Sequence, residues 1–144
     1  MKQKLPVFVY GTLLEGFPNY ERYVRPYRHD AFPAIIKGEL YHLPPGYPGL
    51  LQGTNEITGT VLYFATDEYE SALAGLDELE DYYGAGDLRN EYERIIVPAR
   101  LIGTANKEVM AYVYRYLNEA YVKWKGIRLA HGDWRRFMHE RQTE

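Results

Sequence analysis

The chain has 144 residues, of which 46% are hydrophobic and 26% are charged. This length and composition indicate one domain, spanning residues 1–144, with a hydrophobic core of its own. The net charge of -3 and the scattered basic residues disfavour a nucleic-acid partner, and the absence of cysteine excludes disulfides, thiolate nucleophiles and cysteine-bound metals.

Strands are predicted where β-branched and aromatic residues run together or alternate with other residues. The segments that meet this description are residues 5–13, 35–43, 57–65, 92–102 and 108–117. In the last segment, strict alternation places the tyrosines on one face and Ala111 and Val113 on the other. Pro98 indicates an edge or a bulge in the fourth segment, because proline cannot donate a ladder hydrogen bond.

Helices are predicted at three places. A short helical piece falls within residues 17–27, a main helix starts at Asp67, and residues 119–144 form a C-terminal extension that can pack as a last helix near residues 134–140. Strands therefore outnumber helices. We predict an α+β fold, a small mixed-sheet β-barrel with one main helix.

The start of the chain, Met1 to Lys4, leads directly into the first predicted strand, and no apolar run approaches membrane-spanning length. We therefore expect a cytoplasmic protein without a membrane partner. The four histidines lack the paired spacing of metal ligands, and no serine elbow accompanies them, so neither a metal site nor a nucleophilic triad is expected. They are His29, His42, His131 and His139.

The most informative segment is the first strand, because its apolar run stops at a glycine. The backbone N–H groups of Gly11, Thr12 and Leu13 are then unshielded, and successive amides of this kind form a concavity that suits a carboxylate or an oxyanion. The alternative is an ordinary turn that leaves a strand. The loop is therefore a candidate anion site.

Helical phase singles out one carboxylate, Glu80. With Asp67 as N-cap, the apolar stripe of the main helix contains Tyr69 and Leu76, and Glu80 falls on the same stripe. A carboxylate on an apolar face has a raised pKa and can transfer protons near neutral pH. Asp77 lies at the edge of the stripe. The alternative is that the helix ends before Glu80, which would then be a surface acid.

Several motifs, in this order, resemble the gamma-glutamylcyclotransferase-like family. They are Tyr10-Gly11-Thr12-Leu13, Gly38-Glu39-Leu40-Tyr41, Tyr47-Pro48-Gly49-Leu50, the glycine-bearing run from Ile57 to Tyr63, Leu76-Asp77-x-x-Glu80 and Tyr92-x-Arg94. The resemblance covers most of residues 5–117. It departs from the family pattern at Asp81, where a glycine often follows the glutamate, and in the tail after residue 120.

The resemblance implies an enzyme that converts a γ-glutamyl amino acid or amine to 5-oxoproline and the free amine. Glu80 would be the catalytic general acid and base. Residues Tyr10, Gly11, Thr12 and Leu13 would bind the small-molecule γ-glutamyl substrate through its α-carboxylate. Ring closure within one molecule needs no cofactor. A protein of another class, a non-catalytic binder that keeps the fold, is the alternative.

Tyr92 and Arg94 share one strand face, since they are two residues apart. Tyr92 could donate a hydrogen bond to substrate, or it could only pack in the sheet. Arg94 is expected to pair with Asp77 and so to support the helix end that carries Glu80. The identity of the leaving amine and the oligomeric state do not follow from these motifs.

Overall fold

The structure is a computed structural model that describes residues 4–103, 105 and 107–142. Its elements in chain order are β1 (Val7–Val9), α1 (Pro18–Tyr23), β2 (His29–His42), β3 (Pro48–Phe64), α2 (Tyr69–Leu79), β4 (Tyr92–Leu101), β5 (Glu108–Tyr116), α3 (Glu119–Lys125), β6 (Ile127–Arg128) and α4 (Trp134–Gln142).

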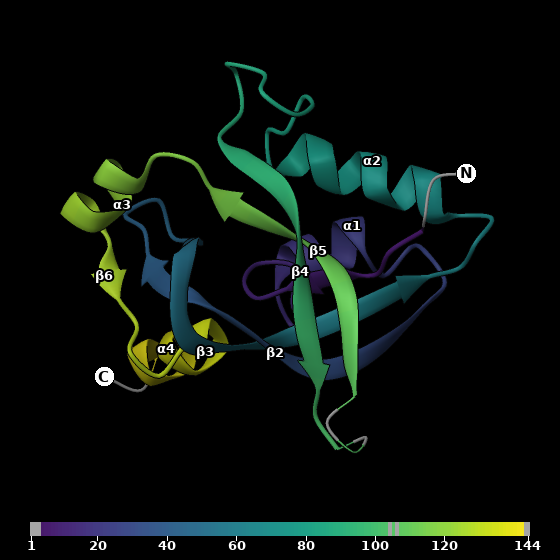
Figure 1. Cartoon of the computed structure of the whole chain (residues 1–144), viewed down its shortest axis with the longest axis horizontal. Helices are drawn as coiled ribbons and strands as arrows, with labels where there is room; N and C mark the ends of the chain where they lie inside the picture. The colour runs from purple at the N-terminus through teal and green to yellow at the C-terminus, as the bar shows by residue number, and fades with distance from the viewer. Residues whose placement is uncertain (1–3, 104, 106, 143–144) are drawn as a thin grey trace.

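Five strands close into a small mixed barrel, as predicted. The strand order is β3-β1-β5-β4-β2, and β2 pairs again with β3 to complete the ring. β1 runs parallel to β5, whereas the other pairs in the ring are antiparallel. The short β6 adds to the end of β2. In Figure 1 the barrel occupies the centre, with α2 along its upper side.

β2 and β3 are longer than the sequence indicates. They form a two-stranded ribbon whose register shifts between Gly38 and Glu39, so that residues 52–54 are unpaired in the ladder. Residues 48–56 are not predicted as a strand, because polar residues on the exposed face interrupt the alternation of apolar and polar side chains. β2 pairs with β4 at Ala34 and Ile35, before the register shift, and with β6 at Tyr41 and His42, after it.

The core has two main parts on either side of β1. Phe8, Ile36, Ile57 and Val113 belong to the cluster inside the barrel. A second cluster fills the space between the barrel and α2. Its members include Val7 and Val9 of β1, Leu73 and Leu76 of α2, and Tyr114 of β5. The alternation predicted for β5 is thus confirmed, and both of its faces are covered.

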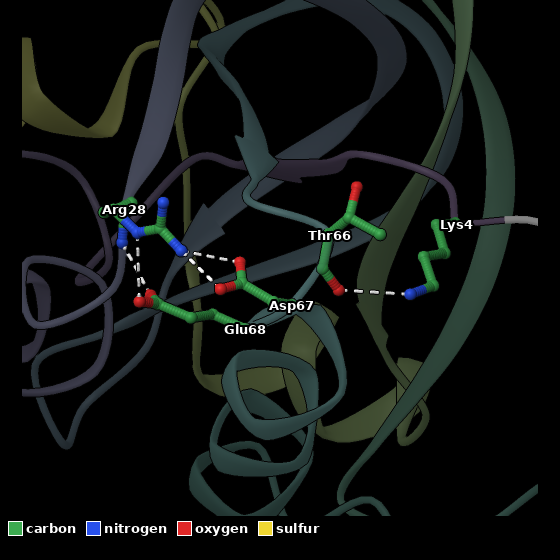
Figure 2. Close-up of polar contacts among 5 residues, drawn as sticks. All are labelled: Lys4, Arg28, Thr66, Asp67 and Glu68. Carbon is green, nitrogen blue, oxygen red and sulfur yellow. Dashed lines mark hydrogen bonds and ion pairs between the residues drawn. The ribbon is translucent and has the colours of Figure 1, made fainter.

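The predicted start of α2 is wrong. The helix begins at Tyr69, and its N-cap residue, Glu68, makes no side-chain cap hydrogen bond. Asp67 instead accepts two hydrogen bonds from the Arg28 guanidinium, both 2.6 Å long, and Glu68 binds the same side chain (Figure 2). The guanidinium of Arg28, the residue just before β2, therefore binds the carboxylate that the sequence pattern assigned to the helix cap.

The tail packs against the rest of the chain. It forms α3, β6 and α4, which lie on the left in Figure 1. Val122, Leu129 and Trp134 are buried, and the Trp134 indole N–H donates to Nδ1 of His42 at 3.0 Å. Within the described part of the chain, no helix has both the length and the apolar character needed to cross a membrane.

Candidate active site

A pocket of about 290 Å³ opens beside the end of β1. Its walls come from the loop after β1, from α1, from the turn before β3, and from the segments that end α2 and precede β4. The predicted catalytic and substrate-binding residues all line this pocket: Tyr10, Gly11, Thr12, Leu13, Glu80 and Tyr92. Segments about seventy residues apart in the sequence therefore meet at one place.

The loop after β1 presents its backbone to the pocket. β1 ends at Val9, four residues before the predicted end. Among the residues that the structure describes, the N–H groups of Gly11, Thr12 and Leu13 have no protein acceptor. These N–H groups are unpaired at the place where the sequence predicts an anion site, and the anion itself stays a prediction.

Glycine is required in this loop because of a close neighbour. A Cβ atom at position 11 would lie 2.3 Å from Cγ of Pro48, far inside van der Waals contact. The neighbouring Thr12 hydroxyl accepts a hydrogen bond from Nδ2 of Asn19 on α1 at 2.9 Å, which leaves the hydroxyl proton free to donate. Tyr10 is buried and donates to the carbonyl of Tyr114 at 2.5 Å.

Glu80 is the first residue after α2. The helix ends at Leu79, but the Glu80 N–H still donates to the carbonyl of Leu76 at 3.0 Å, so the residue keeps the helical phase. Its side chain lines the pocket, partly exposed to it. Burial, together with the negative charges of Glu91 and Asp81, raises the pKa of Glu80 to about 8. A carboxyl group with this pKa can donate and accept protons near neutral pH.

Glu91 is a second carboxylate in the pocket, and the sequence motifs missed it. The Tyr47 hydroxyl donates to Oε1 of Glu91 at 2.7 Å. Burial and the Glu91 contacts raise the pKa of Tyr47 well above its usual value, so this hydroxyl remains a donor. Glu91 lies just before β4, in a segment with no periodicity that could have indicated its direction.

Tyr92 lines the pocket, but its hydroxyl donates its hydrogen bond to the protein backbone. The side chain is buried, and its hydroxyl donates to the carbonyl of Pro48 at 2.8 Å. In this structure the acceptor of the Tyr92 hydroxyl is therefore the backbone at the start of β3. The tyrosine thus fixes the turn that carries Tyr47 and Pro48.

Asp77 and Arg94 are paired as predicted, outside the pocket. Nη1 of Arg94 donates to both carboxylate oxygens of Asp77, and the Tyr114 hydroxyl donates to the same carboxylate at 2.7 Å. The Tyr114 carbonyl in turn accepts from Tyr10. A continuous network thus connects α2, β4 and β5 with the loop after β1. Within the described residues, no group of three or more His, Asp or Glu side chains is placed to hold a metal ion.

Comparison with known proteins defines the class to which this fold and pocket belong. The chain is a member of the gamma-glutamyl cyclotransferase, AIG2-like family, whose model matches residues 7–136. It is 37% identical over 128 residues to gamma-L-glutamyl-butirosin B gamma-glutamyl cyclotransferase from Niallia circulans, a match that covers 87% of this chain and 78% of that protein.

Solved structures show the same fold. An AIG2-like protein from Mus musculus superposes with a TM-score of 0.68 at 19% identity, over 90% of this chain and 87% of the mouse chain. YkqA from Bacillus subtilis superposes with a TM-score of 0.67 at 20% identity, over 97% of this chain and 43% of the longer YkqA chain. The predicted family and fold are therefore confirmed.

Proposed function

We propose that the protein is a γ-glutamyl cyclotransferase that converts a γ-glutamyl amine or amino acid to 5-oxoproline and the free amine. The observation that carries this proposal is the Glu80 carboxyl group, whose raised pKa and place in the pocket suit a group that both accepts and donates a proton. Membership of the cyclotransferase family supports the same reaction.

In this proposal the loop after β1 binds the substrate. The free N–H groups of Gly11, Thr12 and Leu13 hold the α-carboxylate of the γ-glutamyl group, and the Thr12 hydroxyl adds a further donor. This anchoring bends the γ-glutamyl chain so that its own α-amine approaches its γ-carbonyl. Because the reaction is intramolecular, correct folding of the substrate removes much of the entropic barrier, and the step needs no cofactor.

Glu80 then transfers one proton between two nitrogen atoms. The lone pair of the neutral α-amine forms a bond to the γ-carbon, the carbonyl electron pair moves to oxygen, and the Glu80 carboxylate takes a proton from the attacking nitrogen. When the carbonyl re-forms, the bond from carbon to the leaving nitrogen breaks, and Glu80 returns the proton to that nitrogen. Backbone donors near the oxygen stabilise the intermediate oxyanion.

The relative from Niallia circulans supports a γ-glutamyl conjugate as the substrate, since it is named for its action on γ-L-glutamyl-butirosin B. We extend to this chain only the γ-glutamyl part of that substrate.

The test is 5-oxoproline release, followed by NMR, from γ-glutamyl amino acids, γ-glutamyl amines and γ-glutamyl-ε-lysine. Glu80→Gln keeps the shape of the side chain but removes the proton carrier, and we expect it to lower turnover by at least about 100-fold while ligand binding persists. Glu78→Gln is the matched control, because Glu78 is exposed on the same helix. Saturable binding without release by the wild type would instead support a non-catalytic binding protein.

A further inference from the structure

Glu91 differs from the other half-buried carboxylates of the β4 region in having no cationic partner. Asp77 pairs with Arg94 at 2.7 Å and Glu93 pairs with Arg115 at 2.5 Å. In the part of the chain that the structure describes, no Lys, Arg or His lies within ion-pair distance of Glu91. Its hydrogen-bond partner is the hydroxyl of Tyr47, 2.7 Å from Oε1. This hydrogen bond orients the carboxylate without neutralising it.

The pocket around Glu91 is acidic. Its charged lining residues are Glu80, Asp81 and Glu91, and the described residues that line it include no basic side chain. The negative charges of Glu91 and Asp81 are close enough to Glu80 to raise its pKa. A ligand that brings positive charge into this pocket relieves the repulsion between these carboxylates.

Of these three carboxylates, only Glu80 has a role in the proposed reaction. In the proposed reaction Glu80 serves the α-amine and the leaving nitrogen, and the loop amides serve the α-carboxylate. Glu91 remains, next to the ring of Tyr47, which also lines the pocket. An oriented carboxylate beside an aromatic ring is a suitable site for an alkylammonium group.

We infer that Glu91 is a specificity-determining residue that binds a second ammonium group on the leaving amine, so that the substrates are γ-glutamyl conjugates of diamines or larger polyamines. This inference rests on the proposed function. Tyr47 is a positioning residue, because its hydroxyl holds the Glu91 carboxylate in place. A leaving group that ends in a carboxylate is disfavoured in the same pocket by like-charge repulsion.

The test uses three substrates that differ only at the far end of the leaving group. They are γ-glutamyl-cadaverine, γ-glutamyl-hexylamine and γ-glutamyl-aminohexanoate, which end in an ammonium, a methyl and a carboxylate group respectively. We expect the wild type to prefer the ammonium over the methyl substrate by about 10- to 100-fold in kcat/KM, as is typical of a charge-assisted hydrogen bond. Glu91→Gln should abolish this preference, while Glu93→Gln, which alters a carboxylate outside the pocket, should keep it.

Ratios between substrates separate recognition from effects on Glu80. Any change in the pKa of Glu80 alters all three rates of a given variant together and cancels in the ratio. Tyr47→Phe is a second variant, which keeps the charge but removes one positioning hydroxyl, and it should reduce the preference partially.

Two results would overturn the inference. One is equal kcat/KM for the three substrates in the wild type. The other is an unchanged preference in Glu91→Gln; if that variant also loses activity equally with all three substrates, Glu91 would be assigned to the α-ammonium. Absence of 5-oxoproline from every substrate is a different result, since it would refute the proposed function itself.

Discussion

Arg94 donates from one guanidinium nitrogen to both carboxylate oxygens of Asp77, at 2.8 and 2.7 Å, and this pair joins α2 to β4. The side chains are 19% and 25% exposed, so solvent screens the pair only in part. Asp77 lies three residues before Glu80. The ion pair therefore fixes the end of the helix from which Glu80 enters the pocket.

Removing the charge of Asp77 should destabilise the protein and reduce turnover. Asp77→Asn leaves the Arg94 guanidinium without its counter-charge between the rings of Tyr82 and Tyr112, and we expect a loss of about 2 kcal/mol in the free energy of unfolding. Urea denaturation measures it. Glu93→Gln, which breaks the more exposed pair with Arg115, should cost less than about 1 kcal/mol. Equal losses in the two variants would contradict this assignment.

Ionisation of Glu80 should lower the free energy of unfolding as pH rises. Its pKa is about 8 in the folded protein against a usual value of 4.5, so the folded state binds the proton more tightly and stability falls between about pH 4.5 and pH 8. Glu80→Gln lacks this penalty. We expect the variant to match the wild type near pH 4 and to exceed it by on the order of 3 kcal/mol near pH 9. Denaturation at several pH values tests this, and a difference that does not vary with pH would refute it.

The pH profile of kcat/KM should respond to the neighbours of Glu80. Removing a negative charge beside a carboxyl group lowers its pKa, so Glu91→Gln should move the limb assigned to Glu80 from near pH 8 toward lower pH. Asp81→Asn should move it in the same direction by less, because Glu91 is the larger electrostatic cause. γ-Glutamyl-hexylamine is the substrate for this comparison. A limb unchanged in both variants would mean that Glu80 does not produce it.

Gly11→Ala should disturb both stability and activity. The added methyl group would meet Cγ of Pro48 at 2.3 Å, and overpacking of this kind costs about 1 to 3 kcal/mol. Gly75→Ala is the matched control, since its methyl group would lie 3.7 Å from the nearest atom, on Tyr23, within α2. The control should be neutral or slightly stabilising. Thermal unfolding and 5-oxoproline release check both variants, and a Gly11→Ala protein indistinguishable from the wild type would contradict the packing argument.

The tail should be necessary for stability. Trp134 is 1% exposed and contacts the ring of Phe17, so Trp134→Ala is expected to cost about 3 to 5 kcal/mol. Trp124→Ala removes the same side chain from a position that is 76% exposed on α3, and it should change stability by less than about 1 kcal/mol. Equal effects of the two substitutions in chemical denaturation would show that the tail is not part of the core.

Local patterns in the sequence predicted the five barrel strands and the main helix in their order. Alternation predicted β5 and the two faces it buries, and helical phase predicted that Glu80 lies on the side of Leu76. These features depend on residues close together in the chain, where the backbone period fixes the direction of each side chain.

Only the tertiary structure decided the contacts between distant segments. Asp67 binds Arg28 instead of capping the helix. The carbonyl of Pro48 accepts the hydrogen bond from the Tyr92 hydroxyl. The Tyr47 hydroxyl donates a hydrogen bond to Glu91 in the pocket. Closure of the barrel also brought Trp134 into the core beside His42. A polar group bonds to the partner that folding places next to it, and burial makes that bond obligatory. The sequence therefore determined the strands, the loop and Glu80, whereas the barrel determined the partners of the side chains in and around the pocket.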